Sequence, residues 1–227
     1  MQKQLIITED GSHSIFVKGL DEVYHSRFGA VNESRHVFIE AGFKQLTAKP
    51  PNCINILEIG FGTGLNAFLT LQQCIETELH VDYVALEPFP IEKKIWRQLN
   101  YPGLIELPEG DKLFFKLHNC KWGKFVEIHR RFRVQKDLSG IVETELESDC
   151  FDLVYFDAFA PEVAPELWTL PVFQKIFKAM KEGGVFVTYS AKGAVRRALQ
   201  SAGFKVERIP GPKGKREMLR GVKGNDS

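Results

Sequence analysis

The chain has 227 residues, of which 44% are hydrophobic and 26% charged, and its formal net charge is +1. This length fits one domain with small additions, and the composition excludes disordered and disulfide-scaffold classes. No apolar run approaches the ~20 residues of a membrane helix, and the N-terminus lacks a signal-peptide core, so we expect a cytoplasmic protein without membrane contact. The four cysteines and six histidines show no metal-ligand spacing, so we expect no bound metal.

Residues 1–50 predict an extension that packs on the rest of the protein. LIITEDGSHSIFV alternates apolar and polar residues around Asp10 and Gly11, which indicates a β-hairpin. NESRHVFIEAGFKQL then predicts a helix over residues 32–46, with Asn32 or Ser34 available as its cap. We therefore divide the chain into a hairpin-and-helix extension, residues 1–50, and a second unit, residues 51–227.

From residue 51 onward, short apolar strands alternate with amphipathic helices. The predicted strands cover residues 54–60, 80–87, 132–137, 151–157 and 183–190. The predicted helices cover residues 65–76, 90–100, 171–181 and 193–203, and a closing hairpin pairs residues 204–209 with 216–222. Repeated strand–helix units predict an α/β fold with a mainly parallel sheet and helices on both faces. Ligands of such sheets bind beyond the carboxyl ends of the strands.

Charge is distributed unevenly along the chain. Residues 137–167 contain nine acidic residues and no Lys or Arg, whereas residues 192–223 contain ten basic residues and two acidic ones. A second basic cluster, residues 121–136, precedes the acidic block. Two interpretations stay open: these runs are solvated faces, or the basic ones form a surface for a phosphate backbone.

The predicted strand 54–60 leads into a glycine-rich turn, LEIGFGTGLN. Glycines at this point allow a tight turn and let a ligand approach the backbone closely. The turn matches neither G-x-G-x-x-G, which would need a glycine where Leu65 stands, nor the phosphate-binding G-x-x-x-x-G-K-[ST]. An acid, Glu58, precedes the first glycine by two residues and suits a ligand with a cationic amine better than a pyrophosphate.

Two more carboxylates stand at predicted strand ends. Glu87 is placed where a carboxylate can accept from two ribose hydroxyls. Asp137 could accept from an adenine amino group or cap a helix. An amino acid, a ribose and an adenine are the parts of S-adenosylmethionine, so the pattern predicts a methyltransferase that uses this donor. The expected donor contacts are Glu58, Gly60, Phe61, Gly62, Gly64, Asn66, Glu87, Pro88, Asp137 and Asp157.

Several separated stretches resemble one known family. They are YHSRFGAVNESRHVF, GFGTGLN, ALEPFP, YFDAFAPEVAPELWT, TYSAKGAVRR and GKREML. Together, over nearly the whole chain, they resemble the methyltransferase domain of the MnmC-type tRNA enzymes. The resemblance implies a Rossmann-like class I methyltransferase fold and S-adenosylmethionine as the cofactor. It also implies tRNA as the partner, with the aminomethyl group of wobble 5-aminomethyl-2-thiouridine as the methyl acceptor.

The chain departs from the bifunctional members of this family in one respect. Those members carry a second, FAD-dependent domain that makes the aminomethyl substrate. This chain ends soon after the closing hairpin and contains no G-x-G-x-x-G motif for FAD. We therefore expect a stand-alone methyltransferase, whose substrate is supplied by a separate oxidoreductase or another enzyme.

Asp157, in FDLVYFDAFAP, has three interpretations: a helix cap, a solvated strand end or a catalytic carboxylate. DAFAP is similar to the Asp/Asn-Pro-Pro-aromatic motif of amino-group methyltransferases, in which the acid and a backbone carbonyl orient the nucleophile. Positioning of the amine can supply about 7–11 kcal/mol, and we assign Asp157 to this role, with Pro161 stiffening the loop. A carboxylate with a pKa near ~4 is a poor base for an alkylammonium, so we expect solvent to take the proton.

Contacts with the acceptor are predicted from residue type and from the resemblance. Phe159 and Trp168 could stack on a base or pack in the core, and both interpretations stay open. Arg197 and residues 129–133 are further candidates for phosphate contacts. The predicted substrate-binding residues are Tyr24, Glu33, Phe159, Pro161, Arg196, Lys213, Lys215 and Arg216.

Two other functions stay open. The first is transfer to a small-molecule or protein amine, including aminopropyl transfer from decarboxylated S-adenosylmethionine. The basic C-terminal third argues against a polyamine acceptor, which is a polycation. The second is a non-catalytic module that binds the donor and docks to an oxidoreductase.

Overall fold

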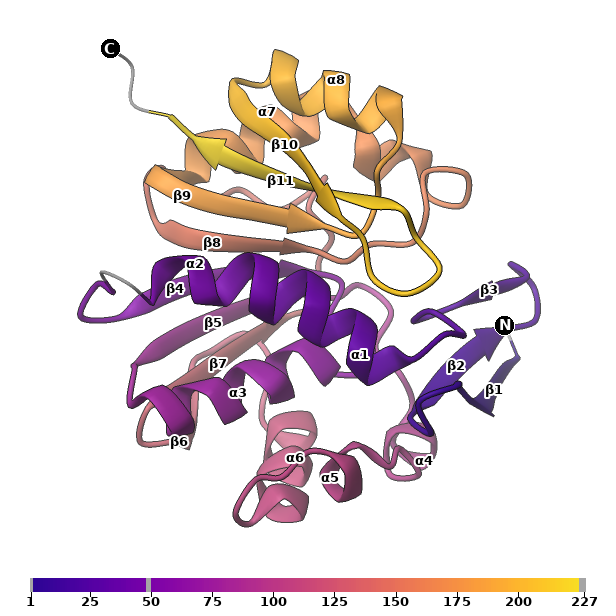
Figure 1. The fold of residues 1–227 in the computed structure, drawn as a ribbon. Coiled ribbons are helices and arrows are strands. Elements are labelled where there is room, and N and C mark those ends of the chain that lie inside the picture. The colour runs from indigo at the N-terminus through magenta and orange to yellow at the C-terminus, as the bar shows by residue number, and fades with distance from the viewer. Residues whose placement is uncertain (1, 48–49, 225–227) are drawn as a thin grey trace.

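The computed structural model describes residues 2–47 and 50–224, and an eight-stranded sheet lies at its centre (Figure 1). The strand order is β10-β11-β9-β8-β4-β5-β7-β6. Strands β4, β5, β7, β8 and β9 pair in parallel, while β6, β10 and β11 are antiparallel to their neighbours. The strands are β4 Ile54–Ile59, β5 Val81–Leu86, β6 Val126–His129, β7 Phe132–Asp137, β8 Phe151–Phe156, β9 Met180–Thr188, β10 Phe204–Pro210 and β11 Glu217–Lys223. The predicted mainly parallel sheet with a closing antiparallel hairpin is confirmed.

The register of the sheet brings four strand ends to one edge. Ile59, the last residue of β4, pairs with Leu86 on one side and with Phe156 on the other. Leu86 in turn pairs with Asp137, the last residue of β7. Because these strands are parallel and end level with one another, the residues that follow them emerge together.

Helices cover both faces of the sheet. One apolar core lies between the sheet and the helical segment 30–46, α3 and α6, and the other lies between the sheet and α7, α8 and the short helix η2. The helices are α1 Ala30–Ser34, the π-helix η1 Arg35–Phe43, α2 Lys44–Leu46, α3 Leu65–Thr77, α4 Lys93–Trp96, α5 Tyr101–Leu104, α6 Gly110–Asn119, η2 Pro165–Trp168, α7 Leu170–Ala179 and α8 Gly193–Ser201. Among the described residues, no helix has both the length and the apolar character of a membrane span.

The first residues form a separate three-stranded sheet. Its strands are β1 Lys3–Ile7, β2 His13–Val17 and β3 Glu22–Val23, and β1 and β2 make the predicted hairpin. This sheet lies beyond the carboxyl ends of the parallel strands of the large sheet (Figure 1). It therefore flanks the edge where ligands of such folds bind.

The helix after this small sheet begins earlier than predicted. It starts at Ala30, so Asn32 lies in its first turn and Ser34 further in, and the prediction that one of them is the cap is wrong. The hairpin turn supplies the missing acceptors instead. The carboxylate of Asp10 accepts from the backbone N–H of Asn32 over 3.0 Å, and the hydroxyl of Ser12 accepts from that of Ala30 over 3.1 Å. The cap therefore comes from about twenty residues upstream.

The same helix continues as a π-helix and packs closely on the large sheet. A Cβ atom at Gly42 would lie 3.1 Å from Val187 and 3.3 Å from Tyr155, so the absence of a side chain permits this approach. The segment shares one apolar core with the sheet. The division of the chain at residue 50 stays a prediction.

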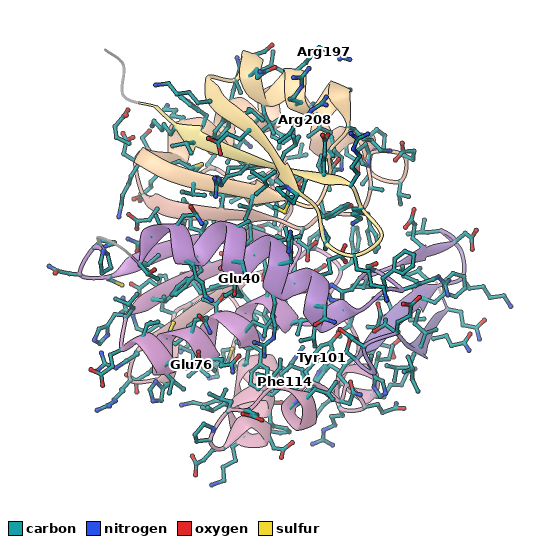
Figure 2. All side chains as sticks on the ribbon, in the orientation of Figure 1. Glu40, Glu76, Tyr101, Phe114, Arg197 and Arg208 are labelled. Carbon is teal, nitrogen blue, oxygen red and sulfur yellow. The ribbon has the colours of Figure 1, made fainter. Side chains whose placement is uncertain are left out.

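Residues 90–131 differ most from the prediction. The helix predicted over residues 90–100 is wrong, because only Lys93–Trp96 is helical there. Helices α5 and α6 and strand β6, none of them predicted, follow it. Tyr101 and Phe114 connect these two helices through rings whose centres lie 5.9 Å apart (Figure 2). Strand β9 also begins earlier than predicted, at Met180, which shortens the preceding helix.

Candidate active site

A cavity of about 820 Å³ opens at the carboxyl edge of the parallel strands, between them and the small sheet. Its volume is that of a site for a molecule of cofactor size. Of the predicted site residues, those that line it are Tyr24, Glu33, Gly60, Phe61, Gly62, Asn66, Glu87, Pro88, Asp157, Phe159 and Lys215. Those that the structure describes outside its lining are Glu58, Gly64, Asp137, Pro161, Arg196, Lys213 and Arg216.

The glycine turn after β4 forms one wall of the cavity. Gly60 has φ +91°, and a Cβ atom there would lie 2.7 Å from the backbone oxygen of Asp157. Gly62 has φ +46°, and a Cβ atom there would lie 3.0 Å from the ring of Tyr24. Any other residue at these positions would have a strained backbone, and its Cβ atom would lie too close to a neighbour. The two glycines therefore allow the tight turn that forms this wall.

Glu87 follows β5 and is tied to the same turn. Its side chain is nearly buried, since the residue is 7% exposed. One carboxylate oxygen accepts from the backbone N–H of Gly62 and the other from that of Phe89, each over 2.8 Å. These two bonds fix the carboxylate at the cavity wall, in the position predicted to face ribose hydroxyls.

Asp157 follows β8 and also reaches the cavity. The side-chain amide of Asn66 donates to Oδ2 of Asp157 over 2.8 Å. The next two helices have Ala164 and Thr169 at their caps, so the helix-cap interpretation of Asp157 is wrong. Burial raises the pKa of Asp157 to about 7, although the Asn66 bond acts in the opposite direction. The carboxyl is therefore partly shielded rather than fully solvated, and its raised pKa differs from the ordinary value.

Glu58 lies behind the cavity rather than in its wall. The residue is fully buried, and the amide of Asn66 donates to Oε1 of Glu58 over 3.0 Å. Burial raises the pKa of Glu58 well above its usual range, with the nearby Asp157 adding to the effect. The predicted direct contact between Glu58 and the donor stays a prediction, although the side chain does not line the cavity. Its contact with Asn66 gives it a supporting position.

Asp137 and Gly64 also stand outside the cavity lining. The carboxylate of Asp137 accepts from the side-chain amide of Gln135 over 3.0 Å. No helix follows Asp137 before η2 in this described stretch, so its helix-cap interpretation is wrong. Gly64, with φ +72°, precedes α3, and a Cβ atom there would lie 2.8 Å from His118. Gly64 thus serves the packing of the turn.

The cavity also has a rim that the sequence analysis missed. Phe89 follows Glu87 and is 77% exposed, and Leu138 follows Asp137 and is 62% exposed. Both line the cavity, together with residues 139–143. Apolar residues one or two positions after strand-end carboxylates, Leu138 after Asp137 and Phe89 after Glu87, are the sequence signal that could have indicated this rim.

Two buried histidines hold the glycine turn through Thr63. Nε2 of His25 lies 2.7 Å from the hydroxyl of Thr63, and Nε2 of His118 donates to the carbonyl of Thr63 over 3.0 Å. Burial lowers the pKa of His25 to about 4 and that of His118 to about 3. Both rings are therefore neutral at physiological pH, and they fix the turn from two sides.

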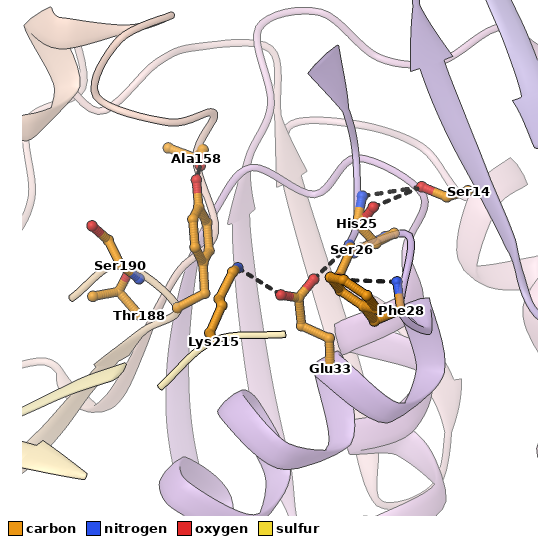
Figure 3. Close-up of polar contacts among 10 residues, drawn as sticks. Ser14, His25, Ser26, Phe28, Glu33, Ala158, Thr188, Ser190 and Lys215 are labelled. Carbon is orange, nitrogen blue, oxygen red and sulfur yellow. Dashed lines mark hydrogen bonds and ion pairs between the residues drawn. The ribbon is translucent and has the colours of Figure 1, made fainter. Parts of the chain in front are cut away.

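Another part of the cavity lining contains an ion pair between distant parts of the chain, Glu33 and Lys215 (Figure 3). Nζ of Lys215 lies 2.7 Å from Oε1 of Glu33 and 4.0 Å from the centre of the Tyr189 ring. Oε2 of Glu33 accepts from the backbone N–H of Ser26 over 2.7 Å. The hydroxyl of Tyr189 donates to the carbonyl of Ala158 over 2.8 Å. These contacts join the closing hairpin and the N-terminal helix to the loop after Asp157.

Of the two aromatic residues in the acceptor prediction, one is in the core. Trp168 is buried against Phe156, with ring centres 4.8 Å apart, and its indole N–H donates to the carbonyl of Phe159 over 2.8 Å. Phe159 lines the cavity and meets the edge of Tyr24 at 5.3 Å. Only Phe159 is therefore placed to meet an acceptor base.

Most of the predicted phosphate contacts lie away from the cavity lining. Lys213 and Arg216 are exposed on the loop between β10 and β11, and Lys213 pairs with Glu9 over 2.8 Å. Pro161 and Arg196 are partly buried outside the cavity. Their predicted contacts with the acceptor stay predictions.

The basic cluster 129–133 lies at the opposite end of β7 from the cavity. It spans the turn from β6 into the first residues of β7, whereas the cavity lies at the far end of β7. Arg133 pairs with Asp82, and Arg131 lies 3.6 Å from Glu78. The phosphate contacts of this cluster stay a prediction, and any such contact would lie far from the cavity.

Comparisons with known proteins agree with this architecture. A family model described as S-adenosyl-L-methionine-dependent methyltransferase matches residues 133–224. The tRNA 5-methylaminomethyl-2-thiouridine biosynthesis bifunctional protein MnmC of Nitrosospira multiformis is 30% identical over 217 residues, covering 88% of this chain and 34% of that protein. The chain thus spans about a third of the length of the curated relatives it matches.

Two solved structures extend the comparison. MnmC2 from Aquifex aeolicus has a TM-score of 0.75 and 28% identity, covering 99% of this chain and 72% of that one. Spermidine synthase from Thermotoga maritima has a TM-score of 0.60 and 14% identity, covering 99% and 70%, a likeness of fold alone. The chain is therefore related to the MnmC-type proteins through their methyltransferase part, and it has the fold of S-adenosylmethionine-dependent methyltransferases.

Proposed function

We propose that this protein transfers a methyl group from S-adenosylmethionine to the aminomethyl group of wobble 5-aminomethyl-2-thiouridine in tRNA. One observation carries the proposal: the partly buried carboxyl of Asp157, whose pKa is raised, shares a single cavity with the glycine turn and with Glu87. The similarity to MnmC proteins supports the substrate class. It also supports a cytoplasmic location.

The residues of the cavity fit the donor. A Cβ atom at Gly60 or Gly62 would intrude on the turn, so the backbone there is kept accessible to a ligand. The carboxylate of Glu87 is fixed to accept from hydroxyl groups, and Pro88 and Leu138 offer apolar surface for a flat base. When bound, the donor supplies a methyl group carried on a cationic sulfur.

Asp157 would position the acceptor amine and take its proton. Asn66 holds Oδ2, which leaves Oδ1 of Asp157 to accept an N–H of the amine. The neutral nitrogen uses its lone pair to form the N–C bond as the C–S bond breaks, and that electron pair remains on sulfur. The resulting ammonium gives a proton to the Asp157 carboxylate, which passes it to water. A pKa of about 7 suits this exchange better than the ordinary value.

The charges around the cavity would orient the RNA. Glu22, Glu143 and Glu166 line it, and Lys215 is the single Lys or Arg among its lining residues. An acidic opening repels phosphates, so the tRNA backbone would follow the loop between β10 and β11, which also carries Lys213 and Arg216. Only the aminomethyl side chain, a cation in water, would enter the acidic cavity.

The test is transfer of labelled methyl from S-adenosylmethionine into tRNA purified from cells that cannot complete this modification, with mature tRNA as the control. Label only in the deficient tRNA, on a wobble-uridine side chain, would support the proposal. It would also exclude a non-catalytic donor-binding module. Absence of label while calorimetry shows donor binding would refute the tRNA substrate and direct the search to other amines.

A further inference from the structure

A primary amine presents two N–H groups when its lone pair points at a methyl donor, so an ordered reaction needs two hydrogen-bond acceptors. Asp157 provides one. The backbone carbonyls of Ala158 and Phe159 each already accept one bond, from the Tyr189 hydroxyl and from the Trp168 indole. Each therefore keeps one lone pair, whose direction is restricted by the existing bond. A second carboxylate would be a stronger acceptor for the other N–H.

Glu33 is the carboxylate placed for this purpose. The residue is only 7% exposed, yet it lines the same cavity as Asp157. Its negative charge is one cause of the raised pKa of Asp157, in agreement with the placement of both carboxyl groups in one cavity. A connected set of contacts joins them, from Glu33 through Lys215 and the Tyr189 ring to the carbonyl of Ala158.

The bonds that Glu33 already makes leave it able to accept another. A carboxylate offers about four lone-pair directions, and Glu33 uses one for Lys215 and one for the N–H of Ser26. These charge-assisted bonds fix the side chain. Lys215 is thus a positioning residue, which acts through Glu33. Glu87 is less suited because of its position: Gly62 and Phe89 hold its carboxylate on the side of the cavity proposed for the donor.

We propose that Glu33 is the second carboxylate of the acceptor site: it and Asp157 each accept one N–H of the primary amine, and this pair limits the reaction to a single methyl group. The inference rests on the proposed function and adds a determinant of product specificity to it.

The limit to one methyl follows from the geometry of nitrogen. After the first transfer and loss of a proton, the amine carries one N–H and one N–CH₃. A second transfer needs the lone pair to face the donor again, which would press the new methyl group against one of the two carboxylates. That carboxylate would lose its hydrogen bond and be shielded from water without compensation. The second transfer is therefore disfavoured.

The experiment follows products by nucleoside mass spectrometry after incubation with excess S-adenosylmethionine. The substrates are tRNA with aminomethyl and tRNA with methylaminomethyl at the wobble uridine. The wild-type protein should methylate the first and act at least about tenfold more slowly on the second. Glu33→Gln should slow the first transfer about tenfold to a hundredfold, leave the dissociation constant of the donor unchanged, and yield a measurable dimethylated nucleoside. Glu40→Gln, on the same helix but exposed and paired with Lys44, is the matched control.

The outcomes separate this inference from the proposed function. A wild-type protein that leaves aminomethyl tRNA unmodified overturns the function and the inference together. If the wild type methylates this tRNA and adds a second methyl as fast as the first, only the inference fails, whatever the variant does. A Glu33→Gln protein with a normal first rate and only single methylation also overturns it. Equal losses of transfer and donor binding in this variant would show a purely structural role for Glu33.

Discussion

Asn66 lies between the buried carboxyl of Glu58 and the partly buried carboxyl of Asp157, and the same amide nitrogen donates to Asp157 over 2.8 Å and to Glu58 over 3.0 Å. Both hydrogens of the amide are thereby used, one for each carboxyl. The orientation of Asp157 thus depends on a side chain at the start of α3, and that side chain is itself held by Glu58. Glu58, which lies outside the cavity lining, therefore helps to orient the carboxyl of Asp157, which is proposed to contact the amine.

Replacement of Asp157 should separate transfer from donor binding. Asp157→Asn keeps the shape but removes the charge and the proton acceptor, so we expect single-turnover methyl transfer to fall about 10²–10⁴-fold. The donor's dissociation constant, measured by calorimetry, should change only slightly. Asp152→Asn is the control, because Asp152 lies at the other end of the same strand, paired with Lys181 over 2.8 Å. Equal losses of affinity and rate would contradict the positioning role.

The same variant should change how stability depends on pH. The pKa of Asp157 is about 7 in the folded protein, against an ordinary 3.8. The folded state thus holds this proton more tightly, and the contribution of Asp157 to the free energy of unfolding falls as pH rises from about 4 to 7. Asp157→Asn removes this loss, so its stability relative to the wild type, measured by urea unfolding, should be greater at pH 8 than at pH 4.

The comparison must be made with the wild type at each pH, because two histidines act in the opposite direction. The folded-state pKa values of His25 and His118, about 4 and about 3, lie below the ordinary 6.5. Their contribution is fully present above pH 6.5 and is lost as pH falls toward those values. A difference between variant and wild type that is the same at both pH values would exclude the raised pKa of Asp157.

Glu87 should matter for donor affinity more than for the transfer step. Glu87→Gln removes the charge from a carboxylate that is fixed at the donor side by Gly62 and Phe89. Loss of charge-assisted bonds to hydroxyl groups should weaken donor binding about tenfold to a hundredfold, with little change in rate at saturating donor. Glu92→Gln, exposed and paired with Lys94, provides the control. A lower saturated rate with unchanged affinity would assign Glu87 to the acceptor instead.

Gly60→Ala should be more harmful than an alanine at another positive-φ glycine. At Gly60, with φ +91°, the new Cβ atom would lie 2.7 Å from the backbone of Asp157. At Gly183, with φ +75°, nothing lies within 4 Å of such an atom. Gly183→Ala should therefore lower the free energy of unfolding by about 1 kcal/mol, the cost of the backbone conformation alone. Gly60→Ala should lower it by about 2 kcal/mol or more and should also lose much of the methyl-transfer activity. Equal denaturation midpoints for the two variants would contradict this prediction, because they would show that the backbone near Asp157 moves away from the new Cβ atom at no cost.

The sheet was predictable because its strands are buried on both faces and read as short apolar runs. Residues 54–60 and 151–157 show this pattern, and the structure pairs them at the centre. Residues 90–131 were not predictable in the same way. Helix α6 is stabilised by packing of Phe114 and Leu117 into a core shared with distant elements, which no local pattern specifies.

The candidate site was predictable where it depends on strand ends. The turn at Gly60, and Glu87 and Asp157, follow neighbouring parallel strands, so topology alone brings them together. Which way a carboxyl points could not be read from the sequence: Glu58 faces the interior and Asp157 the cavity, although both belong to the central strands. The raised pKa of Asp157 likewise depends on burial, which only the assembled fold creates.

The capping of the N-terminal helix by the hairpin turn has a consequence for truncation. Asp10 and Ser12 accept from the first amides of the helix that carries Glu33. Removal of the hairpin would leave these amides without partners and let the first turn fray. Shortening the chain from its beginning would thus disorder one wall of the cavity, although the deleted residues belong to a separate small sheet.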